Sequence, residues 1–310
     1  MAKLCEGRIC IVTGAGGGIG REHSLLLAAH GAKVVVNDLG GSMDGTGAST
    51  GPAQSVVDEI VAAGGEAVAN TDDVSDWEGA KRLVQQAIDT FGGLDVLVNN
   101  AGILRDRMLV NMEEAEWDAV IKVHLKGTFA PARHAAAYWR DRSKAGEEND
   151  ARIINTTSVS GIYGNPGQTN YGAAKMGIAS FTIIAAQELE RYGITVNAIA
   201  PAAYTRMTKN LGGFKPPTPE QEAAALEKQG PQWIAPICVW LASKESREVT
   251  GRVYEASGNV LAVAESWHRG PTAEPTLDPE AIGPIAMELA AKARPNAGMD
   301  GQDRGSHLPG

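Results

Sequence analysis

The stretch "RICIVTGAGGGIGREHSLLLAAHGAKVVVND", from Arg8 to Asp38, decides the fold of this sequence. It holds two runs that are apolar on both faces, "RICIVTG" and "KVVVND", with a helix-length segment between them over about 18–30. Strands that are apolar on both faces are typical of parallel sheets that helices cover on each side. The stretch therefore predicts a strand, a crossover helix and a second, parallel strand.

The same alternation continues along the 310-residue chain. Further short runs rich in Val and Ile are "EAVANT", "LDVLVNN", "ARIINTTS", "ITVNAIA" and, more weakly, "GRVYEAS". Helical patterns separate them, over about 53–63, 76–91, 113–141, 170–191 and 231–243. We therefore expect an α/β fold of the Rossmann type, a doubly wound parallel sheet of about seven strands with helices on both faces.

The length of the chain suits one large core, and we expect a single catalytic domain over residues 1–270. Residues 271–310 form a Pro-rich C-terminal extension with one possible helix near 279–293. Its last part, "RPNAGMDGQDRGSHLPG", is expected to be poorly ordered.

Charge and composition narrow the class of partner. The net charge is −9 and no run of Lys or Arg is present, which argues against nucleic acid or an anionic membrane and favours a small-molecule substrate. We find no signal peptide at the start and no apolar run long enough to cross a bilayer, so we expect no membrane insertion and a cytoplasmic location. The three cysteines lack metal-ligand spacing and are predicted to be reduced thiols, with no metal site.

The turn "TGAGGGIG" after the first strand predicts a nucleotide site. Gly14, Gly18 and Gly20 permit a tight turn and let a pyrophosphate approach the positive N-terminus of the following helix, although a Gly-rich turn alone also suits a surface loop. Asp38 ends the second strand, near the spacing at which a carboxylate meets the ribose hydroxyls of a dinucleotide. No Lys or Arg between positions 37 and 54 could neutralise a 2′-phosphate, so the cofactor is predicted to be NAD rather than NADP.

Two further strand ends carry polar motifs, "TDDVSD" and "NNAG". Because ligands lie at the carboxyl ends of strands in open α/β sheets, Asp73 and Val74 are expected to face the adenine, and Asn100 to border the same site. Asp73 could instead cap a helix and Asn100 could stabilise a turn, and a residue can fill both roles.

The stretch "TTSVSGIYGNPGQTNYGAAK" predicts the chemistry. Tyr171 and Lys175 lie on one helix face, and Ser158 ends the fifth strand at the ligand-facing edge. A phenol needs its pKa lowered by about three units, or about 4 kcal/mol, to act as a base near neutrality. A nearby positive charge can supply this, and an oxidised nicotinamide ring would add a second. We interpret Tyr171 as the acid/base for an alcohol or ketone, Ser158 as the donor that holds its oxygen, and Lys175 as electrostatic aid and ribose anchor. The alternative is an ordinary helix after a serine-rich turn.

These motifs, T-G-x3-G-x-G, N-N-A-G and Y-x3-K, resemble those of the short-chain dehydrogenase/reductase family over about residues 5–265. The resemblance implies strand order 3-2-1-4-5-6-7, a homodimer or homotetramer, and a substrate lid at about 203–228. It also implies cofactor contacts from Tyr171 and Lys175 and from four further residues, Ile19, Gly102, Pro201 and Thr205. The family's "P-G" after the sixth strand is Pro201-Ala202 here, and Thr205 falls one residue earlier than usual.

Four stretches, "VVVNDLGG", "VNNAGILRDR", "VHLKGTF" and "SGIYGNPGQTNYGAAK", resemble more closely the (3R)-hydroxyacyl-CoA dehydrogenase module of the peroxisomal multifunctional enzymes of type 2, whose bacterial relatives include hydroxysteroid dehydrogenases. The resemblance implies an NAD-dependent oxidoreductase that interconverts a 3-hydroxyacyl-CoA and a 3-oxoacyl-CoA. A 17β-hydroxysteroid dehydrogenase is one alternative. An NAD-binding sensor or structural protein without turnover is another, from a different class.

Three features leave two interpretations each. His124 stands where most members of the family carry a catalytic asparagine, and it either shares that role or is a packed, non-catalytic histidine. Arg105 and Arg107 either meet an anionic substrate or form surface or interface ion pairs. The lid residues Lys209 and Lys215, with Arg206, either receive the phosphates of coenzyme A or belong to a solvated amphipathic lid.

Overall fold

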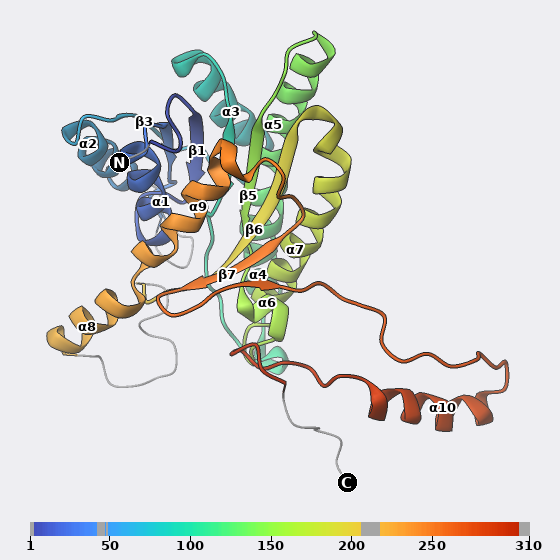
Figure 1. Ribbon diagram of the computed structural model, residues 1–310. Coiled ribbons are helices and arrows are strands. Elements are labelled where there is room, and N and C mark those ends of the chain that lie inside the picture. Colours follow the sequence, from blue (N-terminus) through green and yellow to red (C-terminus); the bar gives the residue numbers. More distant parts are fainter. Residues whose placement is uncertain (1–2, 42–46, 48, 206–217, 304–310) are drawn as a thin grey trace. The chain divides into compact units, whose positions relative to one another are not determined.

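The computed structural model in Figure 1 describes residues 3–41, 47, 49–205 and 218–303. It divides into two compact units, Met1–Ala264 and Glu265–Gly310, so the expected boundary near 270 falls a few residues inside the second unit. Residues 206–217 of the expected lid, including Arg206, Lys209 and Lys215, lie outside the described part. The same holds for residues 304–310 of the terminus that was expected to be poorly ordered.

The first unit is built on one eight-stranded sheet in the order β3-β2-β1-β4-β5-β6-β7-β8. The strands are β1 Ile9–Thr13, β2 Lys33–Asn37, β3 Glu66–Asn70, β4 Val96–Asn99, β5 Ala151–Thr156, β6 Ile194–Ala202, β7 Val253–Ser257 and β8 Leu261–Ala264. The predicted parallel sheet and its order are confirmed for β1 to β7. The eighth strand was not predicted: β8 pairs antiparallel with β7, and its first residue, Leu261, is 68% exposed.

Helices cover both faces of the sheet. The α-helices described in this unit are α1 Gly18–Ala29, α2 Gly51–Ala62, α3 Trp77–Phe91, α4 Glu114–Ile121, α5 Gly127–Lys144, α6 Val159–Tyr163, α7 Thr169–Leu189, α8 Pro219–Gln229 and α9 Ala235–Ala242. Figure 1 shows α1, α2 and α9 against one face and α3, α5 and α7 against the other. Successive residues of a strand point to opposite faces, so Cys10 and Val12 of β1 enter the first core cluster and Ile11 enters the second.

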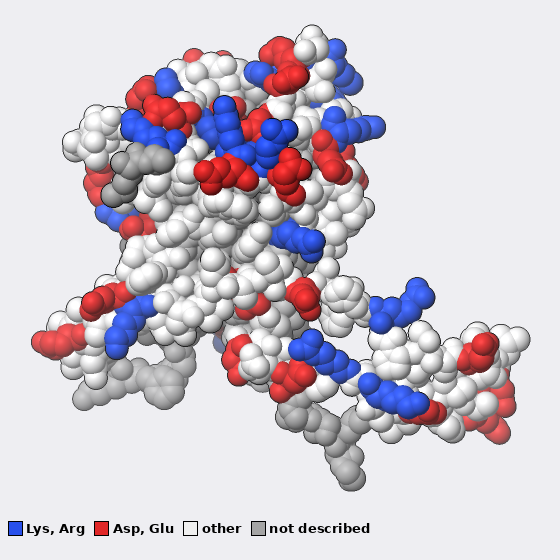
Figure 2. Space-filling model, viewed as in Figure 1, with Lys and Arg blue, Asp and Glu red and all other residues white. Residues whose placement is uncertain are grey.

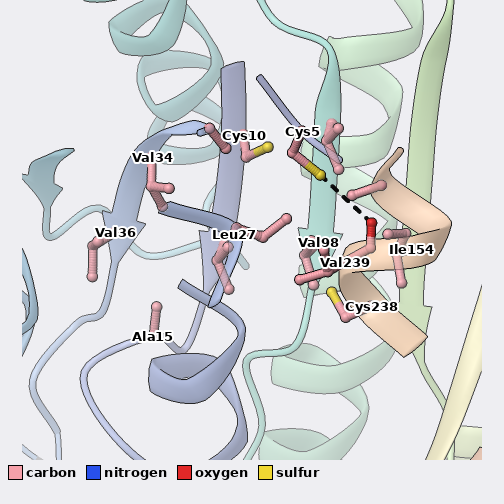
Figure 3. Close-up of a cluster of buried hydrophobic side chains, with 14 of the residues drawn as sticks. Cys5, Cys10, Ala15, Leu27, Val34, Val36, Val98, Ile154, Cys238 and Val239 are labelled. Atoms are coloured by element: carbon pink, nitrogen blue, oxygen red, sulfur yellow. Dashed lines mark hydrogen bonds between the residues drawn. The ribbon is translucent and has the colours of Figure 1, made fainter. Parts of the chain in front are cut away.

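The first of these clusters contains all three cysteines (Figure 3). Cys5, Cys10 and Cys238 are free thiols that pack among Leu27, Val98 and other aliphatic side chains. The Cys5 thiol donates to the carbonyl of Val239, and burial raises its pKa to about 11. The cysteines therefore serve as small apolar core residues that hold their protons at neutral pH.

The helix expected over 113–141 is interrupted. It consists of α4, a π-helical turn at Lys122–Lys126, and α5, which extends to Lys144. A π turn accommodates one extra residue in a helix and is frequent at functional sites. Two short helices were also not predicted: α6, which follows β5, and α8, which a capping box at Thr218 begins inside the expected lid region.

The second unit contains α10, Pro279–Lys292, close to the expected helix near 279–293. The Asp278 side chain caps its N-terminus, and no residue of the helix is buried. Across the described residues, no helix is long and apolar enough to cross a membrane. Figure 2 shows acidic and basic side chains interspersed on the face in view, with no continuous basic area there.

Candidate active site

The glycine-rich turn between β1 and α1 fits a pyrophosphate. Gly17 is the N-cap of α1 and offers no side chain, and the first turn of the helix carries no acidic residue. Gly18 has a φ of +53°, and a side chain there would meet no atom within 4 Å, so the backbone is open to a ligand at this point. At Gly20 a Cβ atom would lie 2.3 Å from the Gly14 carbonyl oxygen, so only glycine fits. The backbone N–H groups of the first helical turn and the helix dipole favour an anion here.

Asp38 lies directly beside this turn. One carboxylate oxygen accepts from the backbone N–H of Gly16 at 2.8 Å, and the other accepts from that of Gly40 at 2.7 Å. These bonds fix the carboxylate between the glycine turn and the end of β2. Each oxygen keeps a lone pair that can accept a ribose hydroxyl.

Asn100 connects the end of β4 to the same turn. Its side-chain amide donates to the carbonyls of Thr13 and Gly14, at 3.0 and 3.1 Å. The hydroxyl of Thr13 in turn accepts from the backbone N–H groups of Asn100 and Ala101. Asn100 therefore has the turn-stabilising role considered from the sequence, and it does so beside the predicted nucleotide site.

The residues after β3 divide between two roles. Asp73 accepts from both the backbone N–H and the hydroxyl of Ser75, and the side chain that caps α3 is Asp76. The interpretation of Asp73 as a helix cap was therefore wrong, because the turn at Asp73 places the helix start three residues later. The Val74 side chain is buried in the second core cluster.

Ser158, Tyr171 and Lys175 meet at the carboxyl end of β5. Ser158 lies two residues beyond the strand and caps α6, accepting from the backbone N–H of Ser160. Tyr171 lies in the first turn of α7, and Lys175 follows one turn later, with its ammonium group 5.5 Å from the centre of the phenol ring. The ammonium also donates to the Thr156 carbonyl at 2.7 Å, which anchors the side chain to the end of β5.

Burial raises the pKa of Tyr171 and lowers the pKa of Lys175. It raises the pKa of Tyr171 to about 12, against a hydrogen bond from Ser158 that lowers it, and the charge of Asp106 raises it further. Burial also lowers the pKa of Lys175 from 10.5 to about 7. The described residues alone do not lower the tyrosine pKa, because desolvation of the phenol outweighs its hydrogen bond with Ser158.

His124 occupies the π turn and is 1% exposed. Its Nε2 lies 3.0 Å from the backbone nitrogen and 2.7 Å from the carbonyl oxygen of Ile103, while its buried Nδ1 has no hydrogen-bond partner among the described residues. The ring stands edge-on to Tyr171, with 5.1 Å between ring centres. Burial and the charge of Lys175 lower the pKa of His124 to about 3, so the ring is neutral at physiological pH.

Other predicted cofactor contacts lie around the same edge. Gly102 touches the His124 ring so closely that a Cβ atom would lie 2.3 Å from its Cε1. Ile19 packs against the first core cluster from the start of α1. Pro201 lies near the end of β6, and Thr205 is the last described residue before position 206.

The segment after "NNAG" makes polar contacts with α4 and with the start of α7, and sequence reasoning missed the contact with α7. Arg107 forms a two-point ion pair with Glu116, which agrees with the ion-pair interpretation for this residue. Asn170, directly before Tyr171, is fully buried and bridges to the carbonyls of Arg105 and Glu116. Only its position beside the tyrosine could have indicated it, because its partners are far away in the sequence.

Comparison with known proteins finds similar sequences over most of this chain. Residues 8–215 match the sequence model of the family described as short chain dehydrogenase. The chain is 44% identical to the hydroxyacyl-CoA dehydrogenase ChsB1 of Mycobacterium tuberculosis, over 85% of this chain and 81% of that protein. It is 45% identical to the peroxisomal multifunctional enzyme type 2 of Mus musculus over 85% of this chain, but it spans only 33% of that longer protein.

A solved structure is similar over almost the whole chain. It is the crystal structure of a short chain dehydrogenase from Mycobacterium avium, with 53% sequence identity and a TM-score of 0.84. The match covers 95% of this chain and 98% of that one, so it extends into the second unit.

Proposed function

The chain belongs to the short-chain dehydrogenase family, and on that premise we propose that it is an NAD-dependent oxidoreductase that interconverts a 3-hydroxyacyl-CoA and a 3-oxoacyl-CoA. The observation that carries the proposal is the meeting of Ser158, Tyr171 and Lys175 beside the glycine turn. The likeness to a hydroxyacyl-CoA dehydrogenase across most of both chains supports the substrate class.

Each of the three residues has a role in moving one proton. A bound nicotinamide ring would supply the hydride donor or acceptor. With its pKa near 12, the Tyr171 phenol is protonated at neutral pH and can give its proton to a ketone oxygen as the carbon gains a hydride. Ser158 holds that oxygen by a hydrogen bond, and Lys175 stabilises the phenolate that remains.

In the oxidation direction the phenolate takes the hydroxyl proton of the substrate as hydride leaves the same carbon. This direction needs a lower tyrosine pKa. Lys175 with a pKa of about 7 is half protonated at neutral pH. Lowering the tyrosine pKa therefore requires full protonation of the lysine or a further positive charge nearby.

Asp38 supports the choice of NAD. Its carboxylate is fixed by two backbone N–H groups where the ribose hydroxyls of a dinucleotide would lie beside the turn. A 2′-phosphate would bring a second negative charge to the same place, at a cost of several kcal/mol if poorly solvated.

Two other expectations stay proposals. A homodimer or homotetramer is supported by the family resemblance and by a cleft between α5 and α7, which the exposed Phe129 lines together with Phe181 and Leu189. A lid over residues 203–228 and a cytoplasmic location remain predictions from the sequence.

The direct test is turnover with defined substrates. NADH formation from NAD should appear with a 3-hydroxyacyl-CoA and should exceed that with a free 17β-hydroxysteroid. Faster turnover of the steroid would assign the alternative dehydrogenase. NAD binding without turnover of either substrate class would favour a sensor.

A further inference from the structure

The catalytic tyrosine lies in the first turn of a helix, α7, that lacks the usual side-chain cap. The N-cap of α7 is Gln168, whose side chain makes no capping bond and instead donates to Asp106 at 2.8 Å. The first N–H groups of a helix have no partner within the helix, so some other group must satisfy them. The backbone N–H of Tyr171 is one of them, and it donates to the side-chain oxygen of Asn170 at 2.7 Å.

Asn170 uses the rest of its amide to reach two other segments. Its nitrogen donates to the carbonyl of Arg105 at 2.9 Å and to that of Glu116, at the start of α4, at 3.2 Å. The residue is 0% exposed, so removing its side chain would leave one buried N–H group and two buried carbonyls without their present partner. One side chain thus joins the catalytic helix, α4 and the segment after β4.

That segment, residues 103–107, forms further hydrogen bonds to the residues at the start of α7. We call it the strap. The backbone N–H of Arg107 donates to the Gly167 carbonyl at 2.8 Å, and Asp106 receives the Gln168 bond. At its other end, Ile103 binds the His124 ring. Just before the strap, Asn100 holds the carbonyls of the glycine turn.

We propose that Asn170 is a positioning residue for Tyr171. It fixes the start of α7 to the strap, and thereby to the residues that border the nucleotide site. The residue acts on the tyrosine rather than on the substrate. The proposal rests on the dehydrogenase function proposed above, because the tyrosine must be the proton donor for its placement to set the rate.

The test is a double-mutant cycle with a matched control. Asn170→Ala should lower kcat at least about tenfold, since small misplacements of a reacting group cost this much or more, and should change the Kd for NAD less than about twofold. In a Tyr171→Phe background the same change should lower the residual kcat by less than about twofold, because the group that Asn170 positions is gone.

The control is Asn149→Ala. Asn149 also donates its amide to two backbone carbonyls, those of Trp139 and Tyr192, but at the opposite end of the sheet from Tyr171. It should lower the unfolding midpoint without changing kcat. Equal effects of the two alanine variants on kcat would overturn the proposal, as would losses that multiply in the Tyr171→Phe background.

A readout that needs no turnover separates this inference from the proposed function. The protein has six tyrosines, and with 3-fluorotyrosine incorporated the Tyr171 signal in ¹⁹F spectra can be assigned through Tyr171→Phe. Asn170→Ala should shift, broaden or split that signal, and Asn149→Ala should not. If the Tyr171 signal is unchanged in Asn170→Ala, the positioning role is overturned even when the enzyme is active. If the signal shifts as expected but the wild type has no activity, only the proposed function is overturned. If Asn170→Ala does not fold, Asn170→Ser takes its place, because serine can still accept from Tyr171 but reaches neither carbonyl.

Discussion

Lys175 should make the stability of this protein depend on pH in a direction that a surface lysine would not. The side chain is 3% exposed, and burial lowers its pKa from 10.5 to about 7. Between these two values the unfolded chain binds a proton that the folded chain has released. Stability must therefore rise as the pH rises through this window.

The size of the effect follows from the two pKa values. Each tenfold change in proton affinity is worth about 1.4 kcal/mol, so the fall from 10.5 to about 7 costs the fold at most about 5 kcal/mol at low pH. Because the folded chain releases the proton as the pH rises, the cost of burying Lys175 is about 1.5 kcal/mol smaller at pH 8.5 than at pH 7. Lys175→Met has a similar shape and no proton to lose, so it lacks this term.

The assay is urea unfolding of wild type and Lys175→Met at several values between pH 7 and 8.5. The free energy of unfolding of wild type, minus that of the variant, should grow by about 1.5 kcal/mol across the range. Lys81→Met, at an exposed position on α3, is the control and should give a difference that does not change with pH. A constant difference for Lys175→Met as well would refute the reasoning, because it would mean that the buried lysine keeps its proton.

Three further predictions concern activity. Tyr171→Phe should leave the Kd for NAD nearly unchanged and lower kcat at least about a hundredfold, the usual scale of acid/base catalysis; a variant that keeps more than a tenth of wild-type turnover would contradict the assignment. Asp38→Ala should move the ratio of kcat/KM for NAD and NADP toward NADP at least about tenfold, since it removes a like charge from the place of the 2′-phosphate; an unchanged ratio would show that specificity lies elsewhere. His124→Asn should cost less than about tenfold in kcat and leave the pH profile between 6 and 10 unaltered, because the ring is neutral throughout that range; a loss as large as that of Tyr171→Phe would make His124 a catalytic residue.

The sheet could be predicted from the sequence because each strand is marked by a pattern within its own short run of residues. Runs such as "KVVVND" are apolar on both faces, and seven of them became the seven parallel strands in the expected order. The edge strand β8 was not predicted because "LAVA" is short and its side chains are mostly exposed, so no pattern of buried residues marks it. The π turn at Lys122–Lys126 also leaves no trace in a helical pattern, because it adds only one residue.

In the candidate site, too, the features that depend on one element could be predicted and those that depend on several elements could not. The spacing of Tyr171 and Lys175 predicted that they meet, since it depends on one helix. The direction of their pKa shifts was not predictable, because it depends on how completely neighbouring elements exclude water. The role of Asn170 was equally hidden, since its partners are backbone carbonyls and any residue type supplies those.

The π turn between α4 and α5 bears on which insertions and deletions the gene can tolerate. Each residue added to or removed from a helix rotates everything beyond it by about 100° about the helix axis. Deleting one residue within Lys122–Lys126 would allow a continuous α-helix, which is locally more favourable, but it would turn Ala132, Ala135 and Trp139 of α5 away from the sheet they now pack against. Descendants of this sequence should therefore keep the length of this turn.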